Sequence, residues 1–315
     1  MLKAALILIV GLAALWGITL WKAARNEARA EARFPPEGQI LVVGEHPVHY
    51  VQTGTGPDVV LIHGASGNTR DMTFALSGAL AARGYRVTVF DRPGLGYTPA
   101  MSPTGDTLAD QASLLAQAAA TLDLRTPIVV GQSYGGAVAL AWGLDHPAGG
   151  LVLLAAVSQP WRSGLSLLYK VTSHPVWGPL VIPVLTAWVP NAYLETAIEA
   201  AFVPQSAPKG YAEHIGASLT LRRASMRANG IQRAQLLEMV RAQQPRYGAL
   251  SLPIEILHGD ADDTVPHSVH AEPLAKQIPH ARLTLLPGIG HMPHHVAQPA
   301  VLEAVDRAAD AAGLR

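Results

Sequence analysis

The sequence predicts an α/β fold with a mostly parallel, eight-stranded sheet that is covered by helices on both faces. Three observations favour this class. Short apolar strands alternate with Ala- and Leu-rich helices along most of the chain, as they do in parallel sheets. The strand at 151–157 is apolar on both of its faces, which is typical of strands covered on both sides. A serine also stands in a glycine-rich turn between a strand and a helix, near residue 133.

The expected elements follow one another in a regular order, beginning with a hairpin. The expected strands lie at 39–44, 47–53, 58–63, 86–91, 128–130, 151–157, 253–258 and 282–286. The expected helices lie at 71–83 and 107–124, directly after Ser133, and at 269–277 and 297–312. In open sheets of this kind the reactive residues gather at the carboxyl ends of the strands, so those ends are where we look for a site.

The alternation stops between Val157 and Ser251. This interval carries eight prolines and scattered aromatic residues, with helical patches near 163–172, 191–202 and 211–243. A loop of that length without structure of its own is uncommon in a compact domain. We therefore expect a helical cap insertion at about 158–248, over the carboxyl edge of the sheet, within a domain that runs from 39 to 315.

Composition excludes several classes of function. Lys and Arg number 23, as do Asp and Glu, so the formal net charge is +0. No basic run occurs outside the N-terminus, and we expect no nucleic-acid partner. The chain has no cysteine, which excludes disulfides, a thiol nucleophile and thiolate metal ligands, and leaves the redox compartment undetermined.

The first 22 residues predict a transmembrane anchor. Residues 4–21 carry no charge and would form a helix about 27 Å long, close to the thickness of a bilayer core. Trp16 and Trp21 stand near its C-terminal end, where interfacial aromatics are common. A cleaved signal peptide is the alternative, but the nearest small-x-small site, at Ala28–Ala30, is late and charged. We expect an uncleaved anchor, membrane localisation and lipid as a partner.

Residues 23–38 are expected to form a charged spacer that begins as a continuation of the anchor helix. Arg25, Arg29 and Arg33 recur every four residues and form one stripe, which either rests on anionic head groups or faces water; we favour a solvated spacer. Phe34-Pro35-Pro36 ends the helix. The basic residues after the anchor favour a cytoplasmic domain, whereas a signal-anchor would export it, so the side of the membrane stays open.

The turn around Ser133 has the sequence of a nucleophile elbow. Ile128, Val129 and Val130 lead into Gly131-Gln132-Ser133-Tyr134-Gly135, and a helical stretch follows at once. A tight strand-to-helix turn pushes the serine hydroxyl outward and leaves no room for side chains two positions to either side. The helix directs its free N–H groups toward the place where an oxyanion would form.

A serine nucleophile needs a base and an orienting acid, and both stand after later strands. With these pieces the chain resembles the α/β-hydrolase family from about Gln39 to its C-terminus, within the group of serine esterases, haloperoxidase-like enzymes and C–C hydrolases. The motifs that carry the resemblance are Leu61-Ile62-His63-Gly64, Phe90-Asp91-Arg92-Pro93-Gly94-Leu95-Gly96-Tyr97, the elbow, Gly259-x-x-Asp262-x-x-Val265-Pro266 and Gly290-His291-x-Pro293.

The resemblance implies Asp262 as the acid, because it is the third residue after the glycine that ends the strand. Asp260 stands too close to the strand end, and Asp263 would point elsewhere in the turn. A variant acid position of the family, after Val157, is occupied here by Ser158 and Gln159 and so offers no carboxylate.

His291 is the expected base. For His294 and His295 we expect solvent-facing or packing roles, and for His63 and His258 structural roles at strand ends. The histidines match no ligand spacing such as H-E-x-x-H, so we expect no metal site, and we expect no cofactor.

The oxyanion hole is expected to consist of two backbone N–H groups, from Tyr134 and from Ala65. Asp91 and Arg92 are expected to support the fold. The predicted function is that of a membrane-anchored serine hydrolase acting on a small carboxylic ester or related acyl compound. C–C bond or amide hydrolysis by the same triad, or a catalytically idle binding module, are the alternatives. The oligomeric state and the substrate are not predicted.

Overall fold

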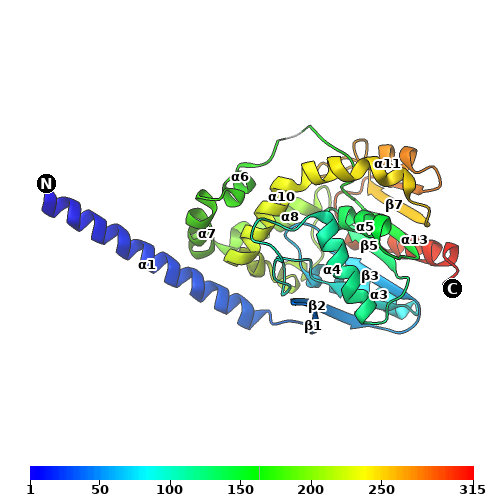
Figure 1. Ribbon diagram of the computed structural model, residues 1–315, viewed down its shortest axis with the longest axis horizontal. Coiled ribbons are helices and arrows are strands. Elements are labelled where there is room, and N and C mark those ends of the chain that lie inside the picture. The colour runs from blue at the N-terminus through cyan, green and yellow to red at the C-terminus, as the bar shows by residue number, and fades with distance from the viewer. Residues whose placement is uncertain (163) are drawn as a thin grey trace.

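The computed structural model describes residues 1–162 and 164–315, and it contains one eight-stranded sheet in the order β1-β2-β4-β3-β5-β6-β7-β8 (Figure 1). β1 and β2 are antiparallel, and β3 to β8 run parallel to one another. The strands are β1 (Gln39–Val43), β2 (His46–Thr53), β3 (Asp58–Ile62), β4 (Arg86–Phe90), β5 (Ile128–Gln132), β6 (Gly150–Leu154), β7 (Ile254–Gly259) and β8 (Arg282–Leu286). The predicted fold class is confirmed, and the strand before Ser133 lies in the middle of the sheet.

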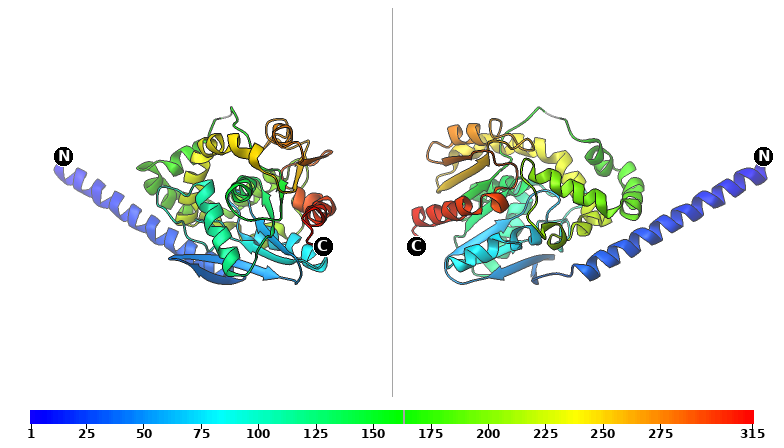
Figure 2. Two further views of the ribbon diagram at one scale, coloured as in Figure 1. Left: turned by 45° about the vertical axis from the view of Figure 1, so that its right-hand side comes forward. Right: turned by 180° about the vertical axis from the view of Figure 1, so that it is seen from behind.

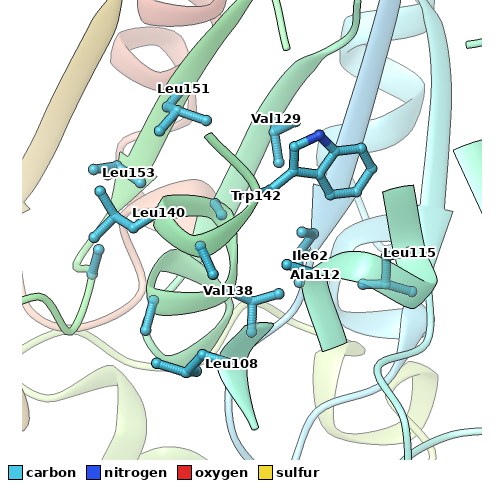
Figure 3. Close-up of a cluster of buried hydrophobic side chains, with 14 of the residues drawn as sticks. Ile62, Leu108, Ala112, Leu115, Val129, Val138, Leu140, Trp142, Leu151 and Leu153 are labelled. Carbon is cyan, nitrogen blue, oxygen red and sulfur yellow. The ribbon is translucent and has the colours of Figure 1, made fainter. Parts of the chain in front are cut away.

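Helices cover both faces of the sheet (Figures 1 and 2). Side chains alternate across each strand, so Val129 of β5 joins the core on one face while Val130 joins the core on the other. On the first face Trp142 packs beside Val129 (Figure 3). The helices outside the cap are α2 (Thr69–Thr73), α3 (Leu76–Ala82), α4 (Leu108–Thr121), α5 (Tyr134–Asp145), α11 (Ala271–Gln277), α12 (Pro293–Val296) and α13 (Gln298–Ala311).

One helix and one strand differ from their expected bounds for local reasons. The single helix expected at 71–83 is divided into α2 and α3. It begins early because the Asn68 side chain caps it by accepting from the Arg70 N–H at 2.9 Å, and it is interrupted at Ala75, which has a non-helical φ of −150°. The strand expected at 151–157 ends at Leu154, because Ala155 has a positive φ of 46°.

The segment between β6 and β7 folds mainly as helices, and we call residues 158–248 the cap. Its elements are α6 (Leu167–Ser173), α7 (Trp177–Trp188), α8 (Asn191–Phe202), α9 (Tyr211–His214), η1 (Ala217–Leu221), α10 (Arg223–Gln243) and the start of η2 (Gln244–Ala249). The helix expected at 163–172 starts at a residue outside the described part of the chain. The helix expected at 211–243 is divided into α9, η1 and α10. Gly216, with a left-handed φ of 60°, separates α9 from η1, and Arg222, with a ψ of 138°, separates η1 from α10.

The N-terminal helix α1 (Leu2–Arg33) is continuous over 32 residues and projects from the rest of the molecule (Figures 1 and 2). It is the one helix of the described residues that is long and apolar enough to cross a membrane, with a mean hydropathy of 2.3 over its most apolar window. A signal sequence has the same properties. Its C-terminal half packs on one side against α7, where the Asn26 amide donates to the Thr186 carbonyl at 3.0 Å, and the stripe of Arg25, Arg29 and Arg33 is exposed.

Candidate active site

Ser133 occupies the turn between β5 and α5 with φ of 52° and ψ of −114°. A non-glycine residue in such a conformation costs about 1–3 kcal/mol, which the surrounding hydrogen bonds must offset. The Ser133 N–H donates to the Leu154 carbonyl at 2.9 Å, and the Ser133 carbonyl accepts from the Val157 N–H at 3.1 Å. Both bonds tie the turn to β6 and the residues after it, so the serine is fixed at the carboxyl edge of the central strands.

The glycines beside Ser133 are required by close backbone contacts. A Cβ atom on Gly131 would lie 2.3 Å from the Gly135 carbonyl oxygen, and a Cβ atom on Gly135 would lie 2.3 Å from the Ile62 carbonyl oxygen. Real Cβ atoms do not approach backbone so closely, so any side chain at either position would force the turn apart. The glycine spacing that singled out Ser133 in the sequence therefore has a steric cause.

Asp262 lies in the turn after β7 and is held by backbone and side-chain donors. Its Oδ1 accepts from the N–H groups of Thr264 and Val265, both at 2.9 Å. Its Oδ2 lies 2.7 Å from His291 Nδ1 and 3.3 Å from His258 Nε2. Burial by itself raises the pKa of Asp262, but the hydrogen bonds from His258 and His291 outweigh it and lower the pKa below the ordinary value. The carboxyl group is therefore ionised at neutral pH.

The loop that carries His291 is joined to the serine turn. The Gln132 side-chain amide, one residue before Ser133, donates to the His291 carbonyl at 3.1 Å. The rival acids lie elsewhere: Asp260 Oδ1 accepts from the Gly288 N–H at 2.6 Å, and Asp263 is exposed. Of the three candidate aspartates, Asp262 is the one that the structure brings to His291.

The loop after β3 is built around a buried arginine. Arg92 donates through Nε to the His63 carbonyl and through Nη2 to the Gly64 carbonyl, both at 3.0 Å. The Arg92 N–H also donates to His63 Nε2 at 3.0 Å, so His63 Nδ1 is the donor toward the Gly64 carbonyl. Burial and the neighbouring Arg92 lower the pKa of His63 to about 4. With these carbonyls fixed by Arg92, the position of the next peptide, at Ala65, is also fixed.

Two cap residues that we did not predict also hold this loop. Ser66 follows Ala65 and has a positive φ of 59°. Asn229 Oδ1 accepts from the Ser66 N–H at 3.0 Å, and Thr220 donates to the Ser66 carbonyl at 2.9 Å. Asn229 and Gln232 are buried polar residues three positions apart on α10, and this spacing is the sequence signal that could have identified a polar contact of the cap.

A cavity of about 620 Å³ connects these residues. Ser133, His291 and Ala65 lie in its wall, and much of the remaining lining is apolar, with α8 of the cap as the largest contributor. Its charged lining residues, within the part of the chain that the structure describes, are Asp71 and Arg233. An apolar cavity with a few convergent polar groups is the usual form of a small-molecule site.

A second group of histidines meets Asp71, and the sequence did not predict it. Asp71 Oδ1 lies 2.9 Å from His295 Nε2 and 3.3 Å from His294 Nε2, and it accepts from the Tyr211 hydroxyl at 2.7 Å. Both histidine side chains are fully buried, so neither faces solvent and both have the packing role.

The ligand atoms of Asp71, His294 and His295 lie within 4.8 Å of one another and are of types that can hold a metal ion. Metal-binding histidines normally donate their second nitrogen to a partner. Here both Nδ1 atoms are buried without a partner among the described residues, and both Nε2 atoms are engaged with the carboxylate. The arrangement fits a hydrogen-bonded carboxylate better than a metal centre.

Comparison with known proteins agrees with the predicted resemblance. The family model described as "Serine aminopeptidase, S33" matches residues 57–296. A 2-hydroxy-6-oxononadienedioate/2-hydroxy-6-oxononatrienedioate hydrolase from Burkholderia vietnamiensis is 39% identical over 112 residues, which are 34% of this chain and 39% of that protein. The chain therefore matches about two fifths of the length of that relative.

Solved structures share the fold. An alpha/beta hydrolase fold protein from Burkholderia ambifaria superposes with a TM-score of 0.68 at 23% identity, over 85% of this chain and 98% of that chain. A membrane phospholipase A superposes with a TM-score of 0.62 at 20% identity, over 97% of this chain and 98% of that chain. At these identities the likeness establishes the α/β-hydrolase architecture and no more.

Proposed function

We propose that this chain, which belongs to the hydrolase family described as "Serine aminopeptidase, S33", is a membrane-anchored serine hydrolase that cleaves carboxylic esters or related acyl compounds. The observation that carries the proposal is the 2.7 Å contact between Asp262 Oδ2 and His291 Nδ1, beside the cavity into which Ser133 also faces. An ionised acid on Nδ1 leaves Nε2 as the nitrogen that can accept a proton from a serine hydroxyl.

The reaction then has two steps. The Ser133 Oγ attacks the substrate carbonyl carbon while His291 Nε2 takes its proton, and the proton passes to the leaving alcohol as the ester bond breaks. His291 next removes a proton from water as the water attacks the acyl-enzyme, and it returns that proton to the Ser133 Oγ when the acid is released. Asp262 stays ionised and stabilises the imidazolium. The N–H groups of Tyr134 and Ala65 donate to the oxyanion in both steps.

Membrane anchoring is the second part of the proposal. It is supported by the continuous helix α1, whose most apolar window is 6% buried and so has little protein to cover it. An apolar helix of this length is stable when lipid surrounds it. N-terminal sequencing of the protein recovered from membranes tests this part: a mature N-terminus beyond residue 30 would show that α1 is a cleaved signal.

C–C bond hydrolysis is a second candidate, favoured by the similarity to the Burkholderia vietnamiensis dienedioate hydrolase. A substrate with two carboxylates needs cationic partners, and the described lining of the cavity offers one guanidinium, Arg233. Esters with one apolar acyl group suit such a lining better.

The decisive experiment is a hydrolysis screen over p-nitrophenyl esters of increasing acyl length, run with the full chain in detergent. We expect turnover, covalent labelling of Ser133 by a fluorophosphonate, and loss of both in Ser133→Ala. Turnover that persists in purified, folded Ser133→Ala would contradict the proposed nucleophile. A dienedioate C–C substrate cleaved faster than every ester would favour the second candidate.

A further inference from the structure

One side of the cap helix α7 is apolar and uncovered. Trp177, Leu180, Val184 and Trp188 are 57%, 46%, 41% and 48% exposed. Their spacing of three, four and four residues places them on one face of the helix. The opposite side of the helix, with Ile182 and Thr186, is buried, and α7 packs against α1, α6 and α10. Four large apolar side chains therefore form a continuous exposed stripe on α7.

The exposed apolar surface continues onto the neighbouring helices. Leu167, in the first turn of α6, is 76% exposed, and Tyr193, in the first turn of α8, is 66% exposed. The sequence from 171 to 194 contains no Asp, Glu, Lys or Arg. Soluble proteins rarely expose apolar surface of this extent without a partner to cover it. We call Leu167, Trp177, Leu180, Val184, Trp188 and Tyr193 the cap face.

The cap face is continuous with the proposed membrane helix. The Trp188 indole N–H lies 3.3 Å from Thr19 Oγ1, and the Lys22 ammonium lies 3.6 Å from the centre of the Trp188 ring. These contacts fall where the uncharged run of α1 ends. Tryptophan and lysine at that position are typical of the boundary between hydrocarbon and water.

The orientation of α1 against the cap is fixed by buried and charged contacts. Glu27 forms an ion pair with Arg223 at 2.7 Å, and Asn26 donates to the carbonyls of Thr186 and Ala187 at 3.0 and 3.3 Å. The N-terminal half of α1 extends past α6 and α7, whereas α13 lies on the far side of the molecule (Figures 1 and 2). If α1 spans a bilayer, the cap is therefore the part of the catalytic domain nearest to it.

We propose that the cap face lies in the interface of the lipid bilayer and that the cavity takes its acyl substrate from that bilayer. This inference rests on the proposed function and names the substrate class, a membrane-resident acyl ester. Leu168 and Tyr193 are exposed on the same helices and also line the cavity that holds Ser133. An acyl chain that leaves the bilayer at the cap face therefore reaches an apolar wall without crossing water.

The absence of cysteine from the sequence allows a direct test of position. Leu180→Cys and Val184→Cys, and Asp310→Cys on α13 as the control, are labelled with an environment-sensitive fluorophore. Each full-length protein is placed as a single copy in nanodiscs of phosphatidylglycerol and phosphatidylethanolamine. We expect lipid-borne quenchers to act on the labels at 180 and 184, and water-soluble quenchers to act on the label at 310.

Labels at 180 and 184 that are as accessible to water-soluble quenchers as the label at 310 would overturn the inference. Protection that is seen in concentrated detergent solution but is lost in single-copy nanodiscs would also overturn it, because it would identify a second copy of the chain as the partner of the cap face.

Activity provides an independent test. The double variant Leu180→Asp, Val184→Asp changes residues outside the cavity lining. We expect it to hydrolyse a long-chain fluorogenic ester embedded in vesicles at least tenfold more slowly than the unaltered protein, and soluble p-nitrophenyl butyrate at the same rate. The control is Val42→Asp, a 63% exposed apolar residue on β1, which should alter neither rate. Equal rates of the double variant and the unaltered protein on the vesicle ester overturn the membrane inference alone; an unaltered protein that cleaves neither ester overturns the proposed function.

Discussion

Two buried aspartates in this molecule each meet two histidines, and we propose a catalytic role for only one of the two groups. Asp262 contacts His258 and His291, and Asp71 contacts His294 and His295. In both groups burial raises the pKa of the carboxyl while its histidine partners lower it below the ordinary value, so both aspartates are ionised. The composition and charge of the two groups are therefore nearly the same.

The groups differ in the orientation of one histidine. His291 meets Asp262 through Nδ1 and lies in the cavity wall, so we propose its Nε2 as the nitrogen that exchanges protons there. His258 meets Asp262 through Nε2, and its Nδ1 is buried without a partner among the described residues, as in the Asp71 group. His294 and His295 meet Asp71 through Nε2, and their Nδ1 atoms are buried without partners among the described residues. Asp71 also accepts from Tyr211 of the cap helix α9. The comparison teaches that an Asp–His pair alone does not distinguish the two groups, and that our proposal of a proton-transfer site rests on the orientation of the His291 ring. The Asp71 group connects α2, α12 and the cap.

The largest expected difference between the groups is in the histidines. We expect His291→Ala to lower kcat by about 10⁴- to 10⁶-fold, because the serine loses its base. His294→Gln should change kcat by less than about tenfold, because no nitrogen of that ring is free for proton transfer. Ester kinetics on both purified variants, with circular dichroism as the control for folding, measure the difference. Comparable losses of kcat in the two variants would contradict the proposed difference between His291 and His294.

The aspartates should follow the same pattern. Asp262→Asn is expected to lower kcat by about 10⁴-fold, because an amide cannot hold the imidazole in the required tautomer or stabilise its cation. Asp260→Asn and Asp263→Asn, as matched controls in the same turn, should stay within about threefold of the unaltered protein. A greater loss in Asp260→Asn than in Asp262→Asn would mean that another carboxylate orients His291.

The contrast between the two groups also shows which parts of the site could be predicted from the sequence. We predicted Ser133, Asp262 and His291 as the catalytic group because each stands at a strand end within a short motif, and parallel strands bring their carboxyl ends together. The structure places Asp262 against His291, and Ser133 and His291 in the wall of one cavity. The Asp71 group was missed because its partners stand 140 to 224 residues away in the chain, and no local pattern encodes such a contact. The sequence did not predict helix α7 because that segment contains Pro179 and Pro183, and proline usually disfavours a helix. In the structure Pro179 falls in the first turn of α7, where proline is tolerated, and Pro183 lies inside the helix.

Substitutions in the Asp71 group should lower the free energy of unfolding more than they lower the catalytic rate. Asp71→Ala leaves the Tyr211 hydroxyl and two ring N–H groups buried without an acceptor, and we expect it to lower the free energy of unfolding by about 3 kcal/mol. Tyr211→Phe, which removes one donor, should cost about 1 kcal/mol. Chemical unfolding of the full chain in detergent checks both values. An unchanged unfolding midpoint for Asp71→Ala would show that the Asp71 group does not stabilise the fold.

Acid pH should weaken the fold through neutral buried histidines. Burial lowers the pKa of His63, His270 and His294 to about 4, with nearby cationic groups adding to the shift. Because these folded values lie below the ordinary pKa of about 6.5, the unfolded chain binds protons first as the pH falls. Stability is then full above about pH 6.5 and decreases toward pH 4, by about 3 kcal/mol for each ring.

Melting temperatures between pH 7.5 and 4.5 measure this dependence, and His294→Gln should flatten it by removing one of the three groups. Stability that rises as the pH falls through this window would contradict the burial of neutral rings.

The smallest expected effect concerns the loop that bears Ala65, which the cap holds through Asn229. Asn229→Ala removes the acceptor of the Ser66 N–H and the donor to the Ser66 hydroxyl. One such hydrogen bond is worth about 1 kcal/mol, so a loop that drifts from its position should reduce kcat by about three- to tenfold. KM for a soluble ester should change little, since Asn229 is 5% exposed and contributes little surface to the cavity. Asn229→Asp keeps the acceptor and should restore most of kcat. A loss confined to KM, or no rescue by Asn229→Asp, would mean that Asn229 acts on substrate binding rather than on the oxyanion loop.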